Sequence, residues 1–338
     1  MTESQGPSSN GRDYESAFHS AREEVRRFLI DAPGIIRAQT RYLAGAEGKN
    51  IRACSVLACA EREDGSIDAG SITAAAAVEL LHLATLVHDD IIDGAEKRRG
   101  IRTLHRKFGE KTAVLCGDYL FSAAFTLAAG IKPPVPRGGV YDRFPAYLSR
   151  ICLGELLQDQ NCRNYKLSES KYFRIIQGKT AALFEASFHI GFLFSDEPES
   201  EESSYVKLGE KIGLIFQLCD DCADYESTQR EEKKPVLSDY KHGVVTLPLI
   251  FSLKNDSRLR EKIKGGMKPG ELRAAVKKAG GIEYTRKKIS ALFSESEQLI
   301  GSIDTTQKKK DRLMMILQMS AGATGADSGQ QGKRHGSG

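Results

Sequence analysis

Two groups of aspartates share one spacing at the ends of apolar helical segments. The first group is Asp89, Asp90 and Asp93, and the second is Asp220, Asp221 and Asp224, which follows the apolar run 212–219. Residues four apart share one face of a helix, so each group places like charges side by side. A solvated acidic turn would explain one such group, but packing does not explain two. The repeated spacing therefore predicts a functional site.

Carboxylate oxygens at this spacing suit Mg²⁺, which takes a few carboxylates and completes its shell with water and phosphate oxygens. Arg98 and Arg99 follow the first group closely and can make bidentate contacts with phosphate oxygens. The two groups are therefore expected to face each other, to bind several Mg²⁺ ions and to hold a diphosphate between them.

Composition argues against other classes of site. The 338 residues include 49 Lys and Arg against 45 Asp and Glu, and the net charge of +4 gives no general argument for binding nucleic acid. Seven cysteines at irregular spacing fit a reducing compartment better than a disulfide framework. Cys219 and Cys222 form a CxxC without a second pair or a nearby histidine, so packing is favoured over zinc.

The ends of the chain and its most apolar stretch bear on location. Residues 1–12 lack the apolar core of a signal peptide and are expected to form a disordered arm, and residues 321–338 a disordered tail. The apolar stretch 71–87 contains Glu79 and His82 and is short for a membrane span, which favours a buried helix. We therefore predict a cytoplasmic protein without a transmembrane segment.

Apolar residues recur at helical spacing along most of the chain, and alternating strand patterns are nearly absent. Helices are predicted over 14–30, 51–63, 71–94, 109–129, 140–162, 168–193, 203–225, 244–254, 269–279 and 281–300. Separators such as KPPVPRGG at 132–139 read as polar connections, not as a linker between domains. The pattern indicates one all-α domain over residues 13–320.

An ordered set of motifs gives the chain a resemblance to trans-isoprenyl diphosphate synthases of the polyprenyl synthetase family, of the medium- or long-chain type. The motifs run from about Gly48 to Leu249: GKNIR (48–52), LHLATLVHDDIIDGAEKRRG (81–100), GDYL (117–120), GELLQ (154–158), GKTAALFEAS (178–187), GLIFQLCDDCADY (213–225) and GVVTLPLI (243–250). The resemblance implies a large helical bundle of the isoprenoid synthase type around a central substrate cavity.

The resemblance also implies an activity and partners. The activity is Mg²⁺-dependent head-to-tail condensation of isopentenyl diphosphate with an allylic diphosphate, in a homodimer. A short-chain farnesyl or geranylgeranyl synthase, a subunit of a heteromeric synthase and a terpene cyclase are the alternatives. Both complete aspartate groups argue against a degenerate subunit, and a second diphosphate pocket argues against a cyclase.

Roles for individual residues follow from the resemblance. Isopentenyl diphosphate would be held by Lys49, Arg52, His82 and Arg99. The allylic diphosphate would be held through Mg²⁺ by Asp89, Asp93 and Asp220, with direct contacts from Arg98, Lys179 and Lys234. Asp90, Asp221 and Asp224 would support the metal sites as ligands or through water. Thr180, Phe216 and Gln217 would flank the carbocation, although Phe216 could equally be a core residue.

Two further features concern product length and departures from the family pattern. Ala84 and Thr85 precede Asp89 by about one turn, where short-chain members tend to carry aromatic residues. The growing allylic chain is expected to enter a tunnel along this helix, and the small size of both residues predicts a product longer than geranylgeranyl diphosphate. The floor of the tunnel would lie deeper, and Phe121 and Phe125 are candidates for it. The alternative is that the two small residues only allow close helix packing. Val244 stands where the family usually has lysine, and Lys241 is a candidate substitute.

Overall fold

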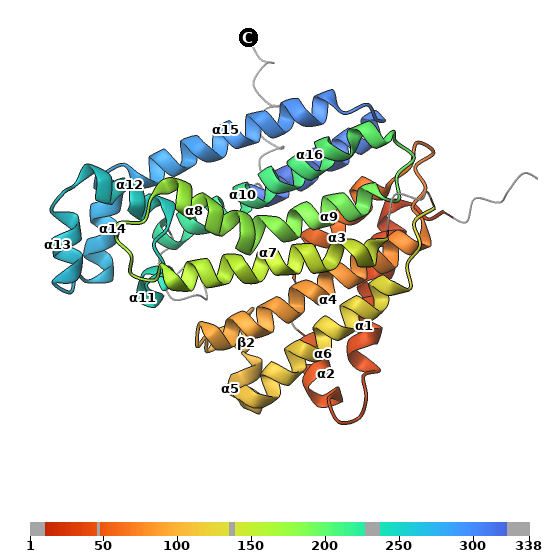
Figure 1. Cartoon of the computed structure of the whole chain (residues 1–338), viewed down its shortest axis with the longest axis horizontal. Helices are drawn as coiled ribbons and strands as arrows, with labels where there is room; N and C mark the ends of the chain where they lie inside the picture. The colour runs from red at the N-terminus through yellow and green to blue at the C-terminus, as the bar shows by residue number, and fades with distance from the viewer. Residues whose placement is uncertain (1–10, 46–47, 135–138, 227–236, 323–338) are drawn as a thin grey trace, which may run out of the picture.

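The computed structural model describes residues 11–45, 48–134, 139–226 and 237–322, and helices make up most of it (Figure 1). Its first half contains α1 (Tyr14–Ile30), α2 (Arg37–Ala44), α3 (Ile51–Ala60), α4 (Ala69–Ile92), α5 (Leu104–Phe108), α6 (Glu110–Ala129) and α7 (Val140–Gln160). Between α4 and α5, the two-residue strands β1 (Lys97–Arg98) and β2 (Ile101–Arg102) form an antiparallel hairpin.

The second half begins with a nearly continuous helical rod. This rod consists of α8 (Glu169–Ile176), the π-helical turn η1 (Gln177–Ala181) and α9 (Ala182–Phe192). The remaining elements are the 3-10 turn η2 (Glu199–Glu201), α10 (Glu202–Glu226), α11 (Ser238–His242), α12 (Leu247–Asn255), α13 (Leu259–Lys264), α14 (Pro269–Lys278), α15 (Gly281–Ser302) and α16 (Gln307–Ser320).

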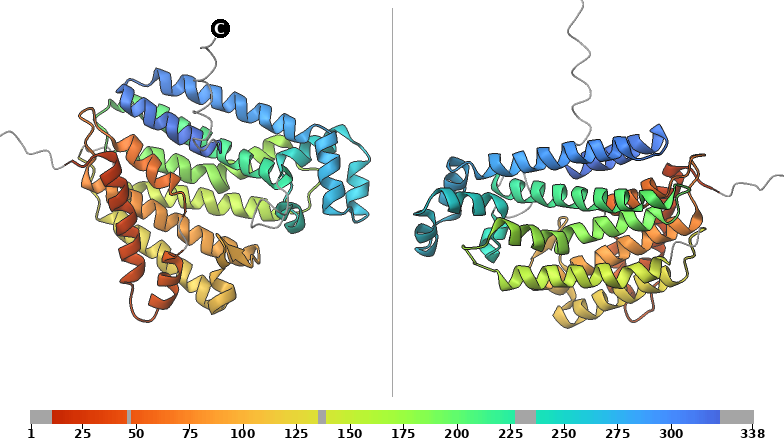
Figure 2. Two further views of the ribbon diagram at one scale, coloured as in Figure 1. Left: turned by 180° about the vertical axis from the view of Figure 1, so that it is seen from behind. Right: turned by 45° about the horizontal axis from the view of Figure 1, so that its top comes forward.

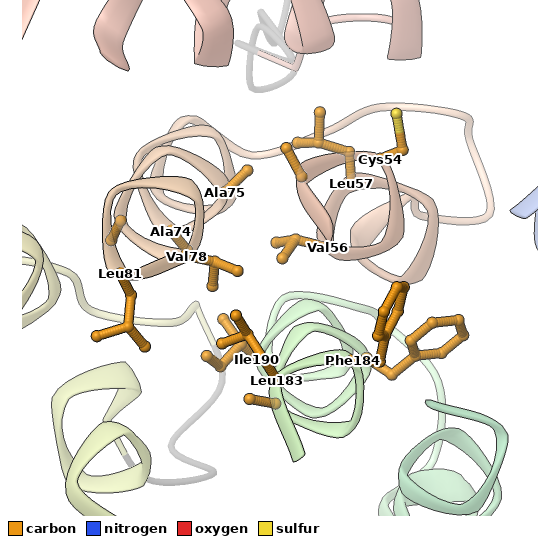
Figure 3. Packing of buried hydrophobic residues seen from close by; sticks show 14 of the residues in the cluster. Cys54, Val56, Leu57, Ala74, Ala75, Val78, Leu81, Leu183, Phe184 and Ile190 are labelled. Carbon is orange, nitrogen blue, oxygen red and sulfur yellow. The ribbon is translucent and has the colours of Figure 1, made fainter. Parts of the chain in front are cut away.

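The core is organised around α3 and α9, in which every residue is buried. A helix that is buried on all sides must be covered by neighbours in several directions. Figure 3 shows α3, α4 and α9 side by side, with Val56, Val78 and Leu183 directed into the space between them. The helices approach closely: a Cβ at Gly191 would lie 2.4 Å from the carbonyl oxygen of Val56. This central packing fixes α4, which carries the first aspartate group.

A second core lies beside the first and joins α8, α10 and α12 to α14 and α15. Figure 2 shows the short helices α12, α13 and α14 gathered at one end of the long, roughly aligned helices. The same views place α15 and α16 next to each other along one face. The second core supports the end of α10, where the second aspartate group lies.

The predicted all-α class and most predicted helices are confirmed. Five helices were not predicted, namely α2, α5, α11, α13 and α16, and neither was the β1–β2 hairpin. The rod from α8 to α9, predicted as one helix, is interrupted by the π turn. Residues 1–10 and 323–338, which hold most of the predicted arm and tail, lie outside the described residues.

The length argument against a membrane span was wrong for α4. Both α4, with 24 residues, and α6, with 20, are long and apolar enough to cross a bilayer by length and composition alone. Core helices pass the same test, and 61% of the apolar window of α4 is buried within the fold. Its packing between α3, α6 and α9 supports the interpretation of α4 as a core helix.

Candidate active site

The centre of the candidate site is the π-helical turn η1, which carries Lys179 and Thr180. Single π turns inside helices often occur at functional sites. Glycines on both neighbouring helices let the turn pack closely. A Cβ at Gly154 of α7 would lie 2.2 Å from the backbone nitrogen of Lys179, and one at Gly213 of α10 would lie 2.5 Å from the Cα of Ala181. These two motif glycines therefore hold Lys179 at a fixed place between α7 and α10.

Lys179 is surrounded by carboxylates from three elements. Its Nζ donates to Glu155 Oε2 of α7 at 2.8 Å. Burial alone would lower the pKa of Lys179, but the negative charges of Glu155 and Asp89 hold it above its ordinary value. Its positive charge also acts on Asp239, beside the second aspartate group. Lys179 therefore links the two acidic regions electrostatically.

In the first aspartate group, the side chain of Asp90 has a hydrogen-bond partner, whereas those of Asp89 and Asp93 have none among the described residues. Asp90 is buried, and its Oδ1 accepts a hydrogen bond of 2.6 Å from Arg98 Nε. Asp89 and Asp93 are half-buried at the end of α4. Burial, followed by the charge of Glu155, raises the pKa of Asp89 to about 7. Such a shift indicates a carboxylate short of compensating positive charge.

The second group divides in the same way. Asp221 is 1% exposed, and its two oxygens accept hydrogen bonds from the Tyr172 hydroxyl and from Gln217 Nε2. Asp224 accepts from the backbone nitrogens of Ser238 and Asp239 and so caps α11. Asp220, in contrast, is exposed on α10.

Three residues form a hydrogen-bonded chain that starts from the π turn. Thr180 Oγ1 donates to Gln217 Oε1 at 2.6 Å, and Gln217 Nε2 donates to Asp221 Oδ1 at 2.8 Å. Because both ends of the Gln217 amide have partners, its carbonyl is directed toward Thr180. Phe216 is half-buried beside this chain, and its ring lies 5.3 Å from that of Phe184.

Basic residues from α3 and the hairpin gather around His82 of α4. Arg52 is 9% exposed, and its Nη1 lies 3.1 Å from His82 Nε2. Its guanidinium carbon lies 4.4 Å from the centre of the Phe184 ring, a cation–π contact. Burial lowers the pKa of Arg52 to about 10. Lys49 is exposed at the start of α3.

Arg99 reaches this region from the tip of the hairpin. Arg99 and Gly100 have φ values of 51° and 85°, as the two central residues of a type I′ turn require. A left-handed arginine is uncommon and costs backbone energy. A Cβ at Gly48 would lie within 2.7 Å of the Arg99 guanidinium carbon, so Gly48 leaves room for this side chain. The hairpin therefore places the Arg99 side chain near Arg52 and His82.

A cavity of about 140 Å³ lies between α1, α2, α3 and α4. Its lining includes Gly48, Asn50, Glu79, His82 and Arg99. Glu79 Oε1 accepts the backbone N–H of Ala53 at 2.9 Å, near the start of α3. Burial raises the pKa of Glu79, and the charges of Arg52 and Arg99 partly offset this. The cavity thus combines apolar side chains from all four helices with a positively charged rim and the half-buried carboxylate of Glu79.

The structure brings most of the predicted site residues into these groups, but not all of them. Lys234 lies outside the described residues. Within the described ranges, no three Asp, Glu, His or Cys side chains already converge to hold a metal ion. The available carboxylates would therefore need phosphate oxygens and water to complete a metal's shell. Carboxylate oxygens are hard donors, and these carboxylates lack compensating positive charge. They therefore suit Mg²⁺ as the metal ion.

Sequence reasoning assigned no role to four residues of the site: Glu79, Glu155, Tyr172 and Asp239. Glu155 lies in the GELLQ motif and Glu79 lies three residues before His82, so their positions in the sequence were a usable signal. The backbone N–H of Asp239 donates to Asp224 at the start of α11, which places Asp239 beside the second group. Burial and the charges of Asp221 and Asp224 raise the pKa of Asp239 well above its ordinary value. Tyr172 has no such signal, since it appears as one apolar position of α8.

Below Asp89 on α4, Ala84 is fully buried and Thr85 is half-buried. The Thr85 hydroxyl donates to the backbone carbonyl of His82 at 2.8 Å, so its methyl group is the part left to face a neighbour. Phe121 of α6 packs against His88, with ring centres 5.3 Å apart, and Phe125 packs against Phe144. On α6, Phe121 therefore lies beside α4 at the level of His88, whereas Phe125 packs against α7.

Comparisons with known proteins agree with this geometry. A family model described as polyprenyl synthetase matches residues 33–279. The chain is 34% identical over 232 residues to a short chain isoprenyl diphosphate synthase of Methanocaldococcus jannaschii, which covers 69% of this chain and 70% of that protein. It is 30% identical over 258 residues to an octaprenyl diphosphate synthase of Haemophilus influenzae, which covers 76% and 77%.

A solved structure gives the same result for the fold. The polyprenyl synthase from Caulobacter crescentus, in complex with calcium and isoprenyl diphosphate, superposes with a TM-score of 0.80 at 25% identity. The superposition covers 94% of this chain and 99% of that one.

Proposed function

The chain belongs to the polyprenyl synthetase family and is a prenyl diphosphate synthase, and on this premise we propose that it makes an all-trans polyprenyl diphosphate by adding isopentenyl diphosphate to an allylic diphosphate. The observation that carries this proposal is the position of Lys179. It lies between carboxylates of the first aspartate group and Asp239, which is where a transferred diphosphate would need a cation.

Mg²⁺ is the proposed cofactor, and Asp89, Asp93 and Asp220 are its proposed ligands. Among the described residues, these three carboxylates have no hydrogen-bond or ion-pair partner, whereas Asp90, Asp221 and Asp224 accept hydrogen bonds within the protein. Divalent metal use is supported by the calcium in the Caulobacter crescentus complex. When bound, Mg²⁺ would neutralise charge on the departing diphosphate.

The two substrates are assigned to the two basic regions. Arg52, His82 and Arg99, together with Lys49, would bind isopentenyl diphosphate beside the cavity. Arg98, Lys179 and Lys234 would bind the allylic diphosphate. The guanidinium and ammonium groups suit phosphate oxygens through charge-assisted hydrogen bonds.

The proposed reaction needs no side-chain nucleophile. The allylic carbon–oxygen bond breaks with its electron pair leaving on pyrophosphate, and the double bond of isopentenyl diphosphate attacks the resulting carbocation. A proton is then lost, in this proposal to the pyrophosphate. In this proposal the Gln217 carbonyl, the Thr180 hydroxyl and the Phe216 ring would stabilise positive charge as it develops, and the Thr180–Gln217 hydrogen bond supports this role.

The proposed product is longer than geranylgeranyl diphosphate. Support comes from the small side chains of Ala84 and Thr85, about one turn below Asp89. The relatives do not decide product length, because they include a short chain synthase and an octaprenyl synthase at similar identity. We also propose that the protein is a homodimer and that it is cytoplasmic. Exposed apolar residues on α6 and α7 support the dimer.

One incubation tests the activity. Purified protein with Mg²⁺, labelled isopentenyl diphosphate and farnesyl diphosphate should incorporate label into an organic-soluble product after phosphatase treatment. Chromatography of the dephosphorylated alcohol then gives the chain length. Absence of incorporation by the protein alone, with incorporation after addition of a second subunit, would favour a heteromeric synthase. Label in a C20 product alone would favour the short-chain alternative.

A further inference from the structure

Tyr172 of α8 is a buried phenol whose hydroxyl has one hydrogen-bond partner among the described residues. It is 3% exposed within the second core, and its hydroxyl donates to Asp221 Oδ2. Burial and then the charge of Asp221 raise the pKa of Tyr172 well above its ordinary value. The phenol hydroxyl is therefore enclosed in the second core with Asp221 as its acceptor.

Asp221 needs such a donor for a physical reason. It is almost completely buried, and the nearby charges of Asp220 and Asp224 repel it. Tyr172 donates a hydrogen bond to one of its carboxylate oxygens, and Gln217 donates to the other. A buried carboxylate held from both sides cannot rotate freely, so Tyr172 fixes the oxygen that Gln217 uses.

Gln217 depends on that fixed oxygen for the orientation of its amide. An amide can flip and exchange its oxygen and nitrogen at little cost unless different partners hold its two ends. Here the amide nitrogen donates to Asp221, and this leaves the carbonyl oxygen to accept from Thr180. If Asp221 were free to rotate, the opposite orientation would become accessible and would direct N–H groups to the place of the carbonyl.

We propose that Tyr172 is a positioning residue for prenyl transfer: through Asp221 it holds the Gln217 carbonyl and the Thr180 hydroxyl toward the developing allylic carbocation. The inference rests on the proposed function and deepens it, because it names the residue that orders the cation-facing side chains. Tyr172 itself acts only through Asp221 in this proposal. Its removal should therefore slow the chemical step and leave substrate binding nearly unchanged.

The test compares Tyr172→Phe with Tyr225→Phe. Tyr225 is a matched control because it is 1% exposed in the same core and its hydroxyl pairs with Thr246 instead of Asp221. In single-turnover reactions with farnesyl diphosphate and isopentenyl diphosphate, Tyr172→Phe should lower the rate about tenfold, which corresponds to about 1.4 kcal/mol in the barrier. The KM values and the Mg²⁺ dependence should stay within about twofold of wild type, and Tyr225→Phe should keep its rate.

Gln217→Leu completes a double-mutant cycle. If Tyr172 acts through Gln217, adding Tyr172→Phe to Gln217→Leu should cause little further loss of rate. Equal rates for Tyr172→Phe and Tyr225→Phe would overturn the proposal, as would additive losses in the cycle or a loss confined to the Mg²⁺ dependence.

A wild-type protein without turnover would contradict the proposed function instead. The Tyr172 assignment would then be judged on crystal structures of wild type and Tyr172→Phe. Rotation of Asp221 together with a changed Gln217 hydrogen-bond pattern supports it, and an unchanged pattern overturns it.

Discussion

At the scale of single residues, the two aspartate groups look alike in sequence, but their members have different surroundings. Asp90 is paired with Arg98, and Asp221 is held by Tyr172 and Gln217. Asp89 and Asp220 lie on the same helices but are directed to more open surroundings. The spacing alone predicted a cation site, but the division into supporting and available carboxylates depends on partners from α8, α11 and the hairpin.

This division predicts different effects of charge removal. Asp89→Asn and Asp220→Asn should each lose most of the turnover, because each removes a proposed metal ligand, while helical content and melting temperature are retained or slightly raised by relief of like-charge repulsion. Steady-state kinetics at saturating Mg²⁺ and circular dichroism would measure both effects. Asp118→Asn on α6, which removes a carboxylate that pairs with His88, is the control. Near-normal turnover in both site variants would contradict the metal assignment.

A second prediction at this scale concerns product length. Thr85→Phe should shorten the product while the first condensation remains active, because a phenyl ring would close the proposed tunnel one turn below Asp89. Thr85 is the better site for this change, since Ala84 is fully buried and a larger side chain there would disturb the core. Chromatography of the products would be compared with Thr126→Phe, an exposed position of α6. An unchanged product spectrum in an active Thr85→Phe enzyme would exclude the tunnel at this level.

At the scale of elements, the start of α3 depends on a residue from another helix. Asn50 precedes the helix with a left-handed φ of 49° and makes no side-chain cap. The carboxylate of Glu79 on α4 accepts the Ala53 N–H in its place. Helix α3 itself was predictable from its apolar run, but this cap was not, because the two residues are 26 positions apart and neither has an N-cap pattern.

Truncation of Glu79 should therefore destabilise the protein. Glu79→Ala leaves a buried N–H without its acceptor and two arginines without their counter-charge, so the free energy of unfolding should fall by about 1–3 kcal/mol. Glu79→Gln keeps an acceptor for Ala53 and should lose less than half as much. Urea unfolding followed by circular dichroism would compare the two variants, and equal losses would indicate that the charge, not the cap, is what matters.

At the scale of the whole molecule, the sequence was sufficient for the all-α class but not for its closing helix. The helix α16 begins with the charged run QKKKDR, and its apolar residues are confined to the second half, so its periodicity is weak. It is anchored by ion pairs with buried carboxylates far away in sequence: Lys309 with Glu197, and Arg312 with Glu61 at a separation of 251 residues. A lysine 1% exposed is not expected from composition, because a buried charge is tolerated only when it is paired.

The exposed apolar residues of α6 and α7 lead to the prediction about assembly. These two helices pack against each other, and they carry Leu115, Leu153 and Leu156, which are 56%, 56% and 57% exposed. Several large apolar side chains in water on neighbouring helices are typical of a surface that another protein covers. Because most soluble oligomers are symmetric dimers of one chain, the expected partner is a second copy.

Charge on this surface should separate the two copies. Wild type is expected to sediment as a dimer, and the double variant Leu153→Glu with Leu156→Glu as a monomer of about 37 kDa. In a dimer of the variant, two carboxylates from each copy would be buried without partners. Ile35→Glu is the matched control, since Ile35 is 95% exposed in the connection between α1 and α2. It should remain dimeric. Sedimentation velocity at several concentrations would distinguish these outcomes, and a monomeric wild type, or a double variant that still dimerises, would show that this surface does not join two copies.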